Sequence, residues 1–216
     1  MQISNNGWDA EFSGRTVGQI YPALAACLEK FLGELPSGSK IIDLGCGDGK
    51  YSFLMADKGF HVLGTDSSVT AISVASEHLR NYPRPGLRFR KAKMQDRLEM
   101  EEGFDGAVLI NSYHCLKNAD RKHAIAGVNR LLVPGGNLFL TALSLEDESY
   151  PRSKWNEIEP NTFSDEAGCT FHFFSDRELR SELAAFDVAQ VSVLSSLKQD
   201  VGRTSSLFIL EARKRG

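Results

Sequence analysis

A glycine cluster between two apolar runs is the part of the sequence whose residue types and spacing best predict chemistry. Residues 41–66 read IIDLGCGDGKYSFLMADKGFHVLGTD, with glycine at Gly45, Gly47 and Gly49 and an acid, Asp66, after the second apolar run. Glycine lets the backbone turn sharply and approach a ligand with no Cβ in the way. A strand-end acid can accept hydrogen bonds from ribose hydroxyls. The order strand, glycine turn, helix, strand, acid predicts a βαβ unit with a nucleotide-type site at its carboxyl edge.

The charges around this turn separate two classes of ligand. A dinucleotide fingerprint, G-x-G-x-x-G, requires glycine at position 50, where this chain has Lys50. Asp43 and Asp48 flank the turn, and their charge would oppose a pyrophosphate at the helix N-terminus. A ligand that carries an ammonium and a sulfonium would be attracted instead. The residues therefore favour S-adenosylmethionine over NAD(P), although a nicotinamide-dependent oxidoreductase stays open as an alternative.

Three motifs in order resemble those of the class I (Rossmann-like) S-adenosylmethionine-dependent methyltransferase family. Residues 43–49, DLGCGDG, resemble the first motif, D/E-x-G-x-G-x-G. Residues 64–68, GTDSS, resemble the second, acidic motif, and residues 131–136, LLVPGG, resemble the L-x-P-G-G turn before the fifth strand. The resemblance covers roughly residues 40–142 by motif. It implies an enzyme with S-adenosylmethionine as its cofactor.

The resemblance also implies roles for individual residues of the first two motifs. The loop backbone is expected to pass under the methionine part of the cofactor, while Asp43 binds its amino group and Asp66 its ribose. Cys46 is expected to be a small loop residue and not a nucleophile, because no histidine near it in the sequence would activate its thiol. The cofactor-binding residues expected here are Asp43, Gly45, Cys46, Gly47, Asp66 and Ser67.

The residues expected at the adenine end depart from the family pattern. The family often places an acid after the third strand, where this chain has Lys93, and a lysine cannot accept a hydrogen bond. Met94 could pack on the adenine ring and offer its backbone amide. Gln95 or Asp96 could replace the missing acceptor. Met94 and Gln95 are therefore added to the expected cofactor-binding residues.

The segment 111–115, NSYHC, follows the predicted fourth strand and lies where the methyl group is expected. Asn111 is expected to contact the cofactor. His114 is the candidate general base, with Tyr113 orienting it; a packing role for His114 stays open. The prolines of the N/D-P-P-Y/F motif of nucleic-acid amino methyltransferases are absent, which argues against that class. His172 is a second candidate base, and its aromatic neighbours favour a structural role.

The alternation of strands and helices predicts an α/β fold. We expect a doubly wound, seven-stranded, mostly parallel Rossmann-like sheet with helices on both faces and the last strand antiparallel. One domain is expected over residues 1–216. Residues 1–36 would form an N-terminal cap segment, irregular up to residue 15 and followed by a helix from about Thr16 to Glu34, which would begin at Tyr21 if Pro22 lies in its first turn. Residues 188–194 and 206–212 alternate and predict a closing antiparallel pair.

Residues 143–174 form a long insertion that is expected to act as a lid or substrate-binding segment. It contains aromatic residues, and so does the N-terminal segment. A further hypothesis is that five residues of these two segments wall the acceptor pocket: Trp8, Arg15, Tyr21, Tyr150 and Trp155.

The bulk composition excludes several partners. The chain has 216 residues, a net charge of -3 and a pI near 6.0, so a nucleic-acid partner is not the default expectation. No apolar run could span a bilayer, and residues 1–12 show no secretory signal. The four scattered cysteines predict neither disulfides nor a metal site, and suggest a cytoplasmic location with an undefined oligomeric state.

Together these features predict methyl transfer from S-adenosylmethionine to a small-molecule nucleophile (O, N or S) by in-line displacement. An RNA or protein methyltransferase is one alternative, supported by a local basic cluster at residues 84–93. A non-catalytic, regulatory S-adenosylmethionine-binding module is another, supported by the departure at Lys93.

Overall fold

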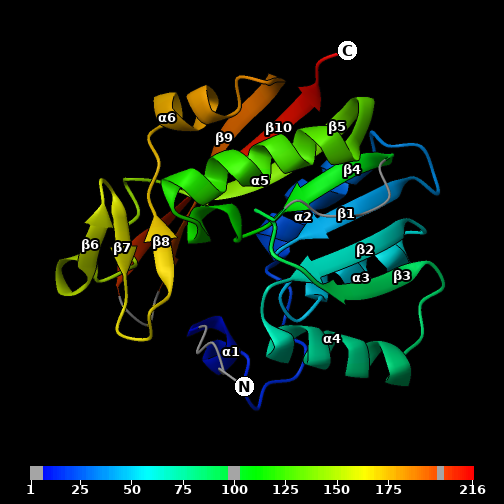
Figure 1. The fold of residues 1–216 in the computed structure, drawn as a ribbon, viewed down its shortest axis with the longest axis horizontal. Coiled ribbons are helices and arrows are strands. Elements are labelled where there is room, and N and C mark those ends of the chain that lie inside the picture. The colour runs from blue at the N-terminus through cyan, green and yellow to red at the C-terminus, as the bar shows by residue number, and fades with distance from the viewer. Residues whose placement is uncertain (1–6, 97–102, 199–201) are drawn as a thin grey trace.

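The computed structural model describes residues 7–96, 103–198 and 202–216 (Figure 1). Its helices are α1 (Gly7–Glu11), α2 (Pro22–Leu32), α3 (Lys50–Asp57), α4 (Val69–Asn81), α5 (Asn118–Leu131) and α6 (Asp176–Glu182), with short 3-10 turns at Tyr113–Cys115 and Arg152–Lys154. Its strands are β1 (Lys40–Leu44), β2 (His61–Asp66), β3 (Leu87–Lys91), β4 (Phe104–Leu109), β5 (Leu132–Leu143), β6 (Asn156–Glu159), β7 (Thr162–Ser164), β8 (Thr170–His172), β9 (Phe186–Lys198) and β10 (Arg203–Lys214).

Within the described residues, seven strands form one sheet in the order β3-β2-β1-β4-β5-β10-β9. The pairs from β3 to β5 are parallel, whereas β10 runs antiparallel to both β5 and β9. The predicted fold class, including the antiparallel last strand, is confirmed. The predicted closing pair lies inside β9 and β10, which continue beyond it at both ends.

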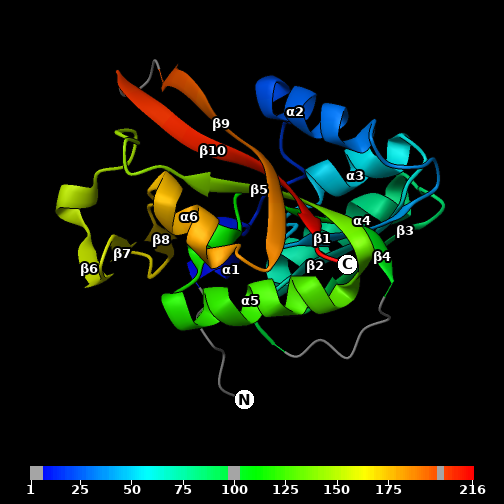
Figure 2. The ribbon, with the colours of Figure 1, turned by 90° about the horizontal axis from the view of Figure 1, so that it is seen from above.

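Helices cover both faces of this sheet, because consecutive residues of a buried strand point to opposite sides. In β1, Ile41 packs with Leu28 of α2 and Met55 of α3 in one buried cluster. Its neighbour Ile42 belongs to a second cluster with Val128 of α5. Figure 2 shows α2 and α3 on one side of the sheet and α5 on the other. The sheet thus separates two apolar layers and leaves its carboxyl edge free for a site.

The amino-terminal segment differs from the sequence prediction in one respect. Residues 7–11 are helical and form α1, so the prediction of an irregular segment up to residue 15 was wrong there. The next helix begins at the later of its two predicted starts and not at Thr16, with Tyr21 as its N-cap and Pro22 in the first turn, where a missing amide is tolerated. Residues 1–6 of the predicted cap segment lie outside the described residues.

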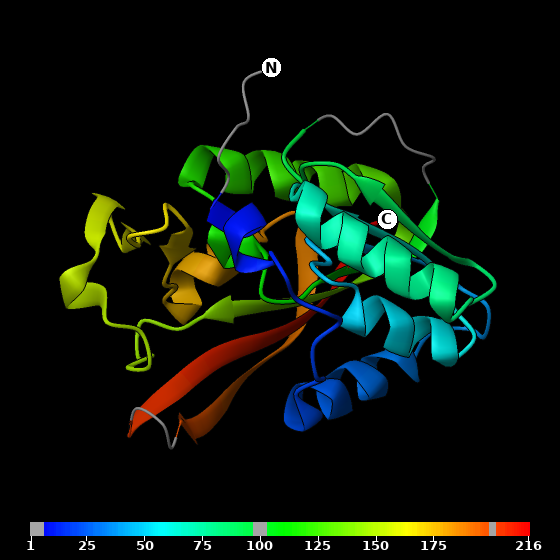
Figure 3. The ribbon, with the colours of Figure 1, turned by 90° about the horizontal axis from the view of Figure 1, so that it is seen from below.

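The insertion at residues 143–174 contains a second, small sheet in the order β6-β7-β8. Figures 1 and 3 show α1 between this sheet and α4. The contact is close, since a Cβ on Gly7 would lie 2.5 Å from the carbonyl oxygen of Ala167. In the described parts of the chain, no helix is long and apolar enough to cross a lipid bilayer.

Candidate active site

The glycine turn after β1 is tied to the end of β2. The backbone amides of Gly45 and Cys46 both donate to the carbonyl of Thr65, at 2.7 and 2.9 Å. Gly45 has a positive φ of 75°, and a Cβ there would lie 2.3 Å from the Cβ of Ser112. Glycine is therefore required both by the backbone conformation and by the close approach of the segment after β4.

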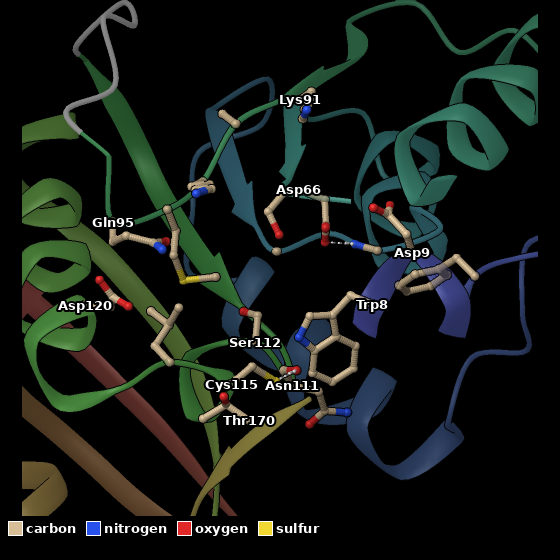
Figure 4. Close-up of a pocket in the computed structure, with 18 of the residues that line it drawn as sticks. Trp8, Asp9, Asp66, Lys91, Gln95, Asn111, Ser112, Cys115, Asp120 and Thr170 are labelled. Carbon is tan, nitrogen blue, oxygen red and sulfur yellow. Dashed lines mark hydrogen bonds between the residues drawn. The ribbon is translucent and has the colours of Figure 1, made fainter. Parts of the chain in front are cut away.

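Asp66, the last residue of β2, is held by two backbone amides. Its Oδ2 accepts from Gly47 at 2.9 Å, the bond drawn in Figure 4, and its Oδ1 accepts from Ser68 at 2.8 Å. Burial raises the pKa of this carboxyl, while the amides of Ser68 and Gly47 oppose that shift. The carboxylate thus has a fixed orientation toward the glycine turn.

A cavity of about 480 Å³ opens at this carboxyl edge, a volume typical of sites for small ligands (Figure 4). Most of the residues predicted to bind the cofactor line it. They are Gly45, Gly47, Asp66, Ser67, Met94, Gln95 and Asn111. The Met94 side chain lies against the turn, with its Cε 3.0 Å from where a Cβ on Gly45 would be.

Two predicted residues lie beneath this cavity and do not line it. Asp43 is 2% exposed and accepts a 2.5 Å hydrogen bond from the Ser52 hydroxyl. Burial raises the pKa of Asp43 to about 7. Cys46 is also buried, and burial raises the pKa of its thiol well above the usual range, which agrees with the expectation that it is not a nucleophile.

Several lining residues were not predicted from the sequence. Asp9 and Phe12 come from the amino-terminal segment, and Ser112 and Asp120 come from the region after β4. Figure 4 shows Gln95 and Asp120 on one side of the cavity, opposite Asp9. Asp96, the other suggested acceptor, does not line the cavity. The sequence shows Asp120 only as an acid near the start of a helix. The folded segment after β4 is what brings it to the carboxyl edge of the sheet.

A second cavity of about 610 Å³ shares Trp8 and Asn111 with the first. The insertion, the amino-terminal segment and the ends of β9 and β10 all contribute to it. Four of the five residues proposed as acceptor walls line it: Trp8, Tyr21, Tyr150 and Trp155. The fifth, Arg15, lines neither cavity and forms a 2.8 Å ion pair with Glu11.

His114 lines the second cavity although its side chain is almost completely buried. Burial lowers its pKa to about 4, while the charge of Asp147 and a hydrogen bond to the Thr141 backbone oppose that shift. Among the described residues Nδ1 has no hydrogen-bond partner. We therefore assign a neutral ring at pH 7 whose proton faces Thr141, which leaves Nδ1 as an acceptor.

Tyr113 does not take the orienting role that the sequence analysis predicted. It is fully buried, lines neither cavity, stacks on Phe174 at 5.7 Å and donates its hydroxyl to Glu182. The same carboxylate accepts from the buried guanidinium of Arg121 at 2.9 Å. His172, the second candidate base, hydrogen-bonds Thr162 and Glu178 and fits the structural role that was favoured for it.

Comparisons with known proteins agree with this arrangement. Residues 41–136 match a family model described as a methyltransferase domain. The crystal structure of an S-adenosylmethionine-dependent methyltransferase from Methanosarcina mazei superposes with a TM-score of 0.74 and 24% identity, over 92% of this chain and 99% of that one.

Two curated relatives match by sequence. A ubiquinone biosynthesis O-methyltransferase of Leptothrix cholodnii is 26% identical over 150 residues, which are 69% of this chain and 63% of that protein. Probable tRNA methyltransferase 9B of Homo sapiens is 31% identical over 137 residues, or 62% of this chain and 28% of that protein. This chain covers less than two thirds of the length of either relative. Residues 41–136 thus match a methyltransferase domain, and the described chain has the strand order and the fold of the Methanosarcina mazei enzyme, in agreement with the three motifs.

Proposed function

We propose that this protein binds S-adenosylmethionine in the first cavity and methylates a small molecule held in the second. The observation that carries the proposal is that the two cavities meet at Trp8 and Asn111. One cavity has a glycine turn and a strand-end acid, while the other has aromatic walls and a histidine. A methyl donor and an acceptor would thus approach each other beside these two shared residues.

The residues of the first cavity fit the cofactor. Asp66 would accept hydrogen bonds from the ribose, and Gly45 and Gly47 leave room for the methionine part beside the turn. Met94 would pack on the adenine, and Gln95 with Asp120 would supply polar contacts that Lys93 cannot. S-adenosylmethionine supplies a methyl group that its sulfonium already activates.

The protein's own contribution would be positioning. Holding two reactants in line can supply about 7–11 kcal/mol of a reaction barrier. His114 would orient the acceptor, because it lines the second cavity and its buried Nδ1, which has no hydrogen-bond partner among the described residues, would accept from an N–H or O–H group once acceptor binding uncovers it. Asp43 would contribute without lining the cavity: it would stabilise the glycine turn and favour a cationic ligand.

We also propose that residues 1–36 and 143–174 act as cap and lid of a single domain. Both segments supply walls of the second cavity, through Trp8 and Tyr21 on one side and Tyr150 and Trp155 on the other. A cytoplasmic location is part of the proposal and rests on four cysteines that are all unpaired.

An RNA acceptor is the second candidate, favoured by a specific observation. Lys91 and Lys93 are exposed and line the first cavity, and Arg88 and Arg90 are exposed on the same edge strand, β3, that ends at Lys91. Such a stripe could contact phosphates. RNA binding that weakens steeply with added salt would support this candidate.

The test is the thermal unfolding midpoint with S-adenosylmethionine, S-adenosylhomocysteine or NADH. A ligand at 100 times its Kd stabilises the folded state by about 2.7 kcal/mol. For a chain of this size that corresponds to a shift of roughly 5–10 °C. We expect the shift with both adenosyl compounds and none with NADH. A shift with NADH alone would contradict the proposal, and so would the absence of a shift with any of the three ligands.

A further inference from the structure

Resting on the proposed function, we propose that the acceptor is a small amine whose positive charge the second cavity recognises. The cavity's lining combines carboxylates, a wall of aromatic rings and a neutral hydrogen-bond acceptor. This combination fits an ammonium group, and it fits an anionic or purely apolar acceptor poorly.

The charged residues that line the cavity are of one sign. Among the described lining residues, Glu11 and Asp165 are acids, and none is a lysine or an arginine. A third carboxylate, Asp147, is fully buried and acts electrostatically on both His114 and Tyr150. A cation in the cavity would therefore meet a negative potential that a low-dielectric surrounding strengthens.

Two arginines lie near this cavity without lining it. Arg15 pairs with the exposed side of Glu11 at 2.8 Å. Arg152 lies with its guanidinium carbon 4.5 Å from the centre of the Phe173 ring and donates to the backbone carbonyls of Leu145 and Asp147. Even with both counted, the three carboxylates outnumber the two cations.

The aromatic wall is continuous. Trp155 stacks on Phe171 with ring centres 4.9 Å apart, Tyr150 packs against Trp155 at 5.5 Å, and Trp8 meets the edge of Phe171 at 5.6 Å. All four rings line the cavity. The face of an aromatic ring attracts a cation, by about 2 kcal/mol or more where water is excluded. A wall of such rings with acids beside it would hold an ammonium group.

The chemistry of the acceptor agrees with this reading. An ammonium first gives up one proton to solvent. The nitrogen's lone pair then forms the new bond to the methyl carbon as the carbon–sulfur bond breaks, and the positive charge moves from sulfur to nitrogen. One N–H would meanwhile donate to the buried Nδ1 of His114, once acceptor binding uncovers that atom. An alcohol would have to transfer its proton during attack, which is a harder task for a histidine held neutral by burial.

Calorimetric titration of choline and its uncharged isostere 3,3-dimethylbutan-1-ol tests the proposal, with and without saturating S-adenosylhomocysteine. The anion 3,3-dimethylbutanoate is the third probe. We expect choline to bind at least about tenfold more tightly than either, as desolvated cation–π contact predicts. Equal or tighter binding of the alcohol or the anion, or no binding of choline, overturns the proposal. Failure of S-adenosylhomocysteine itself to bind overturns the proposed function instead.

A charge-neutral variant sharpens this test. Asp165 Oδ1 accepts from the amides of Ala167 and Cys169, and Asp165→Asn keeps that acceptor while it removes the charge. Combined with Glu11→Gln, it should weaken choline binding several-fold and leave the alcohol unchanged. Glu166→Gln is the matched control, because it removes the same charge from an exposed neighbour that does not line the cavity. Equal weakening by the control would contradict selective recognition.

Discussion

The carboxylate of Asp9 accepts a 2.6 Å hydrogen bond from the hydroxyl of Ser68, across 59 residues of sequence. The same oxygen accepts from the amide of Thr70 at 3.2 Å. Ser68 also caps α4, since its Oγ accepts from Ala71 at 3.0 Å. Asp9 therefore fixes α1 to the start of α4, and this contact places Trp8 and Phe12 at the first cavity.

Asp9→Ala should loosen α1 and weaken cofactor binding. Loss of a hydrogen bond to a charged group costs about 1.5–3 kcal/mol at most, and less at a partly exposed site, so we expect the Kd for S-adenosylhomocysteine to rise by about tenfold. Isothermal titration calorimetry measures it. Asp9→Asn retains an acceptor and should recover part of the loss. An unchanged Kd in Asp9→Ala would mean that α1 does not support the site.

Asp66→Ala should weaken binding of S-adenosylhomocysteine more strongly than any other single change at the glycine turn. It removes both the proposed ribose acceptor and the bond to Gly47, for an expected loss of about 1.5–3 kcal/mol, or roughly 10- to 150-fold. Asp57→Ala is the control, since Asp57 is exposed at the end of α3. Equal affinities in the two variants would refute the assignment.

Local sequence signals sufficed for the sheet and for the glycine turn. The turn needs a positive φ at Gly45 and Gly47, and glycine at these positions of the sequence predicts that conformation. A buried parallel strand appears in the sequence as a continuous apolar run. Asp9 and Asp120 gave no comparable signal. Their approach to the cavity depends on how α1 docks and how the segment after β4 folds back, and neither is encoded in spacing along the chain.

Asp120 offers a sharper test of the adenine end. If it accepts a hydrogen bond from the adenine amino group, the protein should prefer S-adenosylhomocysteine to S-inosylhomocysteine, which has a carbonyl there. We expect Asp120→Asn to reduce that preference by about tenfold, as for one charge-assisted hydrogen bond. Lys122→Gln, on the same helix and outside the cavity, should preserve it. An unchanged preference in Asp120→Asn would leave the role to Gln95.

Tyr113 and His114 are neighbours in sequence, yet their environments differ. They lie in a 3-10 turn, in which successive side chains point about 120° apart, so that His114 faces the second cavity while Tyr113 enters the core. Sequence position alone could not separate these directions. The prediction of a catalytic pair therefore failed for one member.

Tyr113→Phe should lower stability without touching chemistry. It removes the hydroxyl that donates to Glu182, at a cost of about 1–2 kcal/mol in the free energy of unfolding. Urea unfolding measures that loss, and the affinity for S-adenosylhomocysteine and the turnover of any accepted amine should stay as in wild type. A large fall in turnover with unchanged stability would restore a catalytic role to Tyr113.

The burial of His114 makes stability depend on pH. Its folded pKa of about 4 lies below the ordinary value of 6.5, so the unfolded chain binds the proton more readily between those values. The contribution of His114 to the free energy of unfolding is therefore fully present above about pH 6.5. It is lost as the pH falls toward 4, by roughly 3 kcal/mol. His172, whose pKa burial lowers to about 3, adds to the loss in the same direction.

His114→Gln should flatten this dependence, because glutamine has no proton to gain. Urea unfolding at pH 7 and pH 4.5 measures it. We expect wild type to lose about 2–3 kcal/mol more than the variant over that interval. His123→Gln, on the exposed side of α5, is the control and should follow wild type. Parallel curves for wild type and His114→Gln would show that the ring is not held neutral by burial, and would remove the basis for treating Nδ1 as an acceptor in the second cavity.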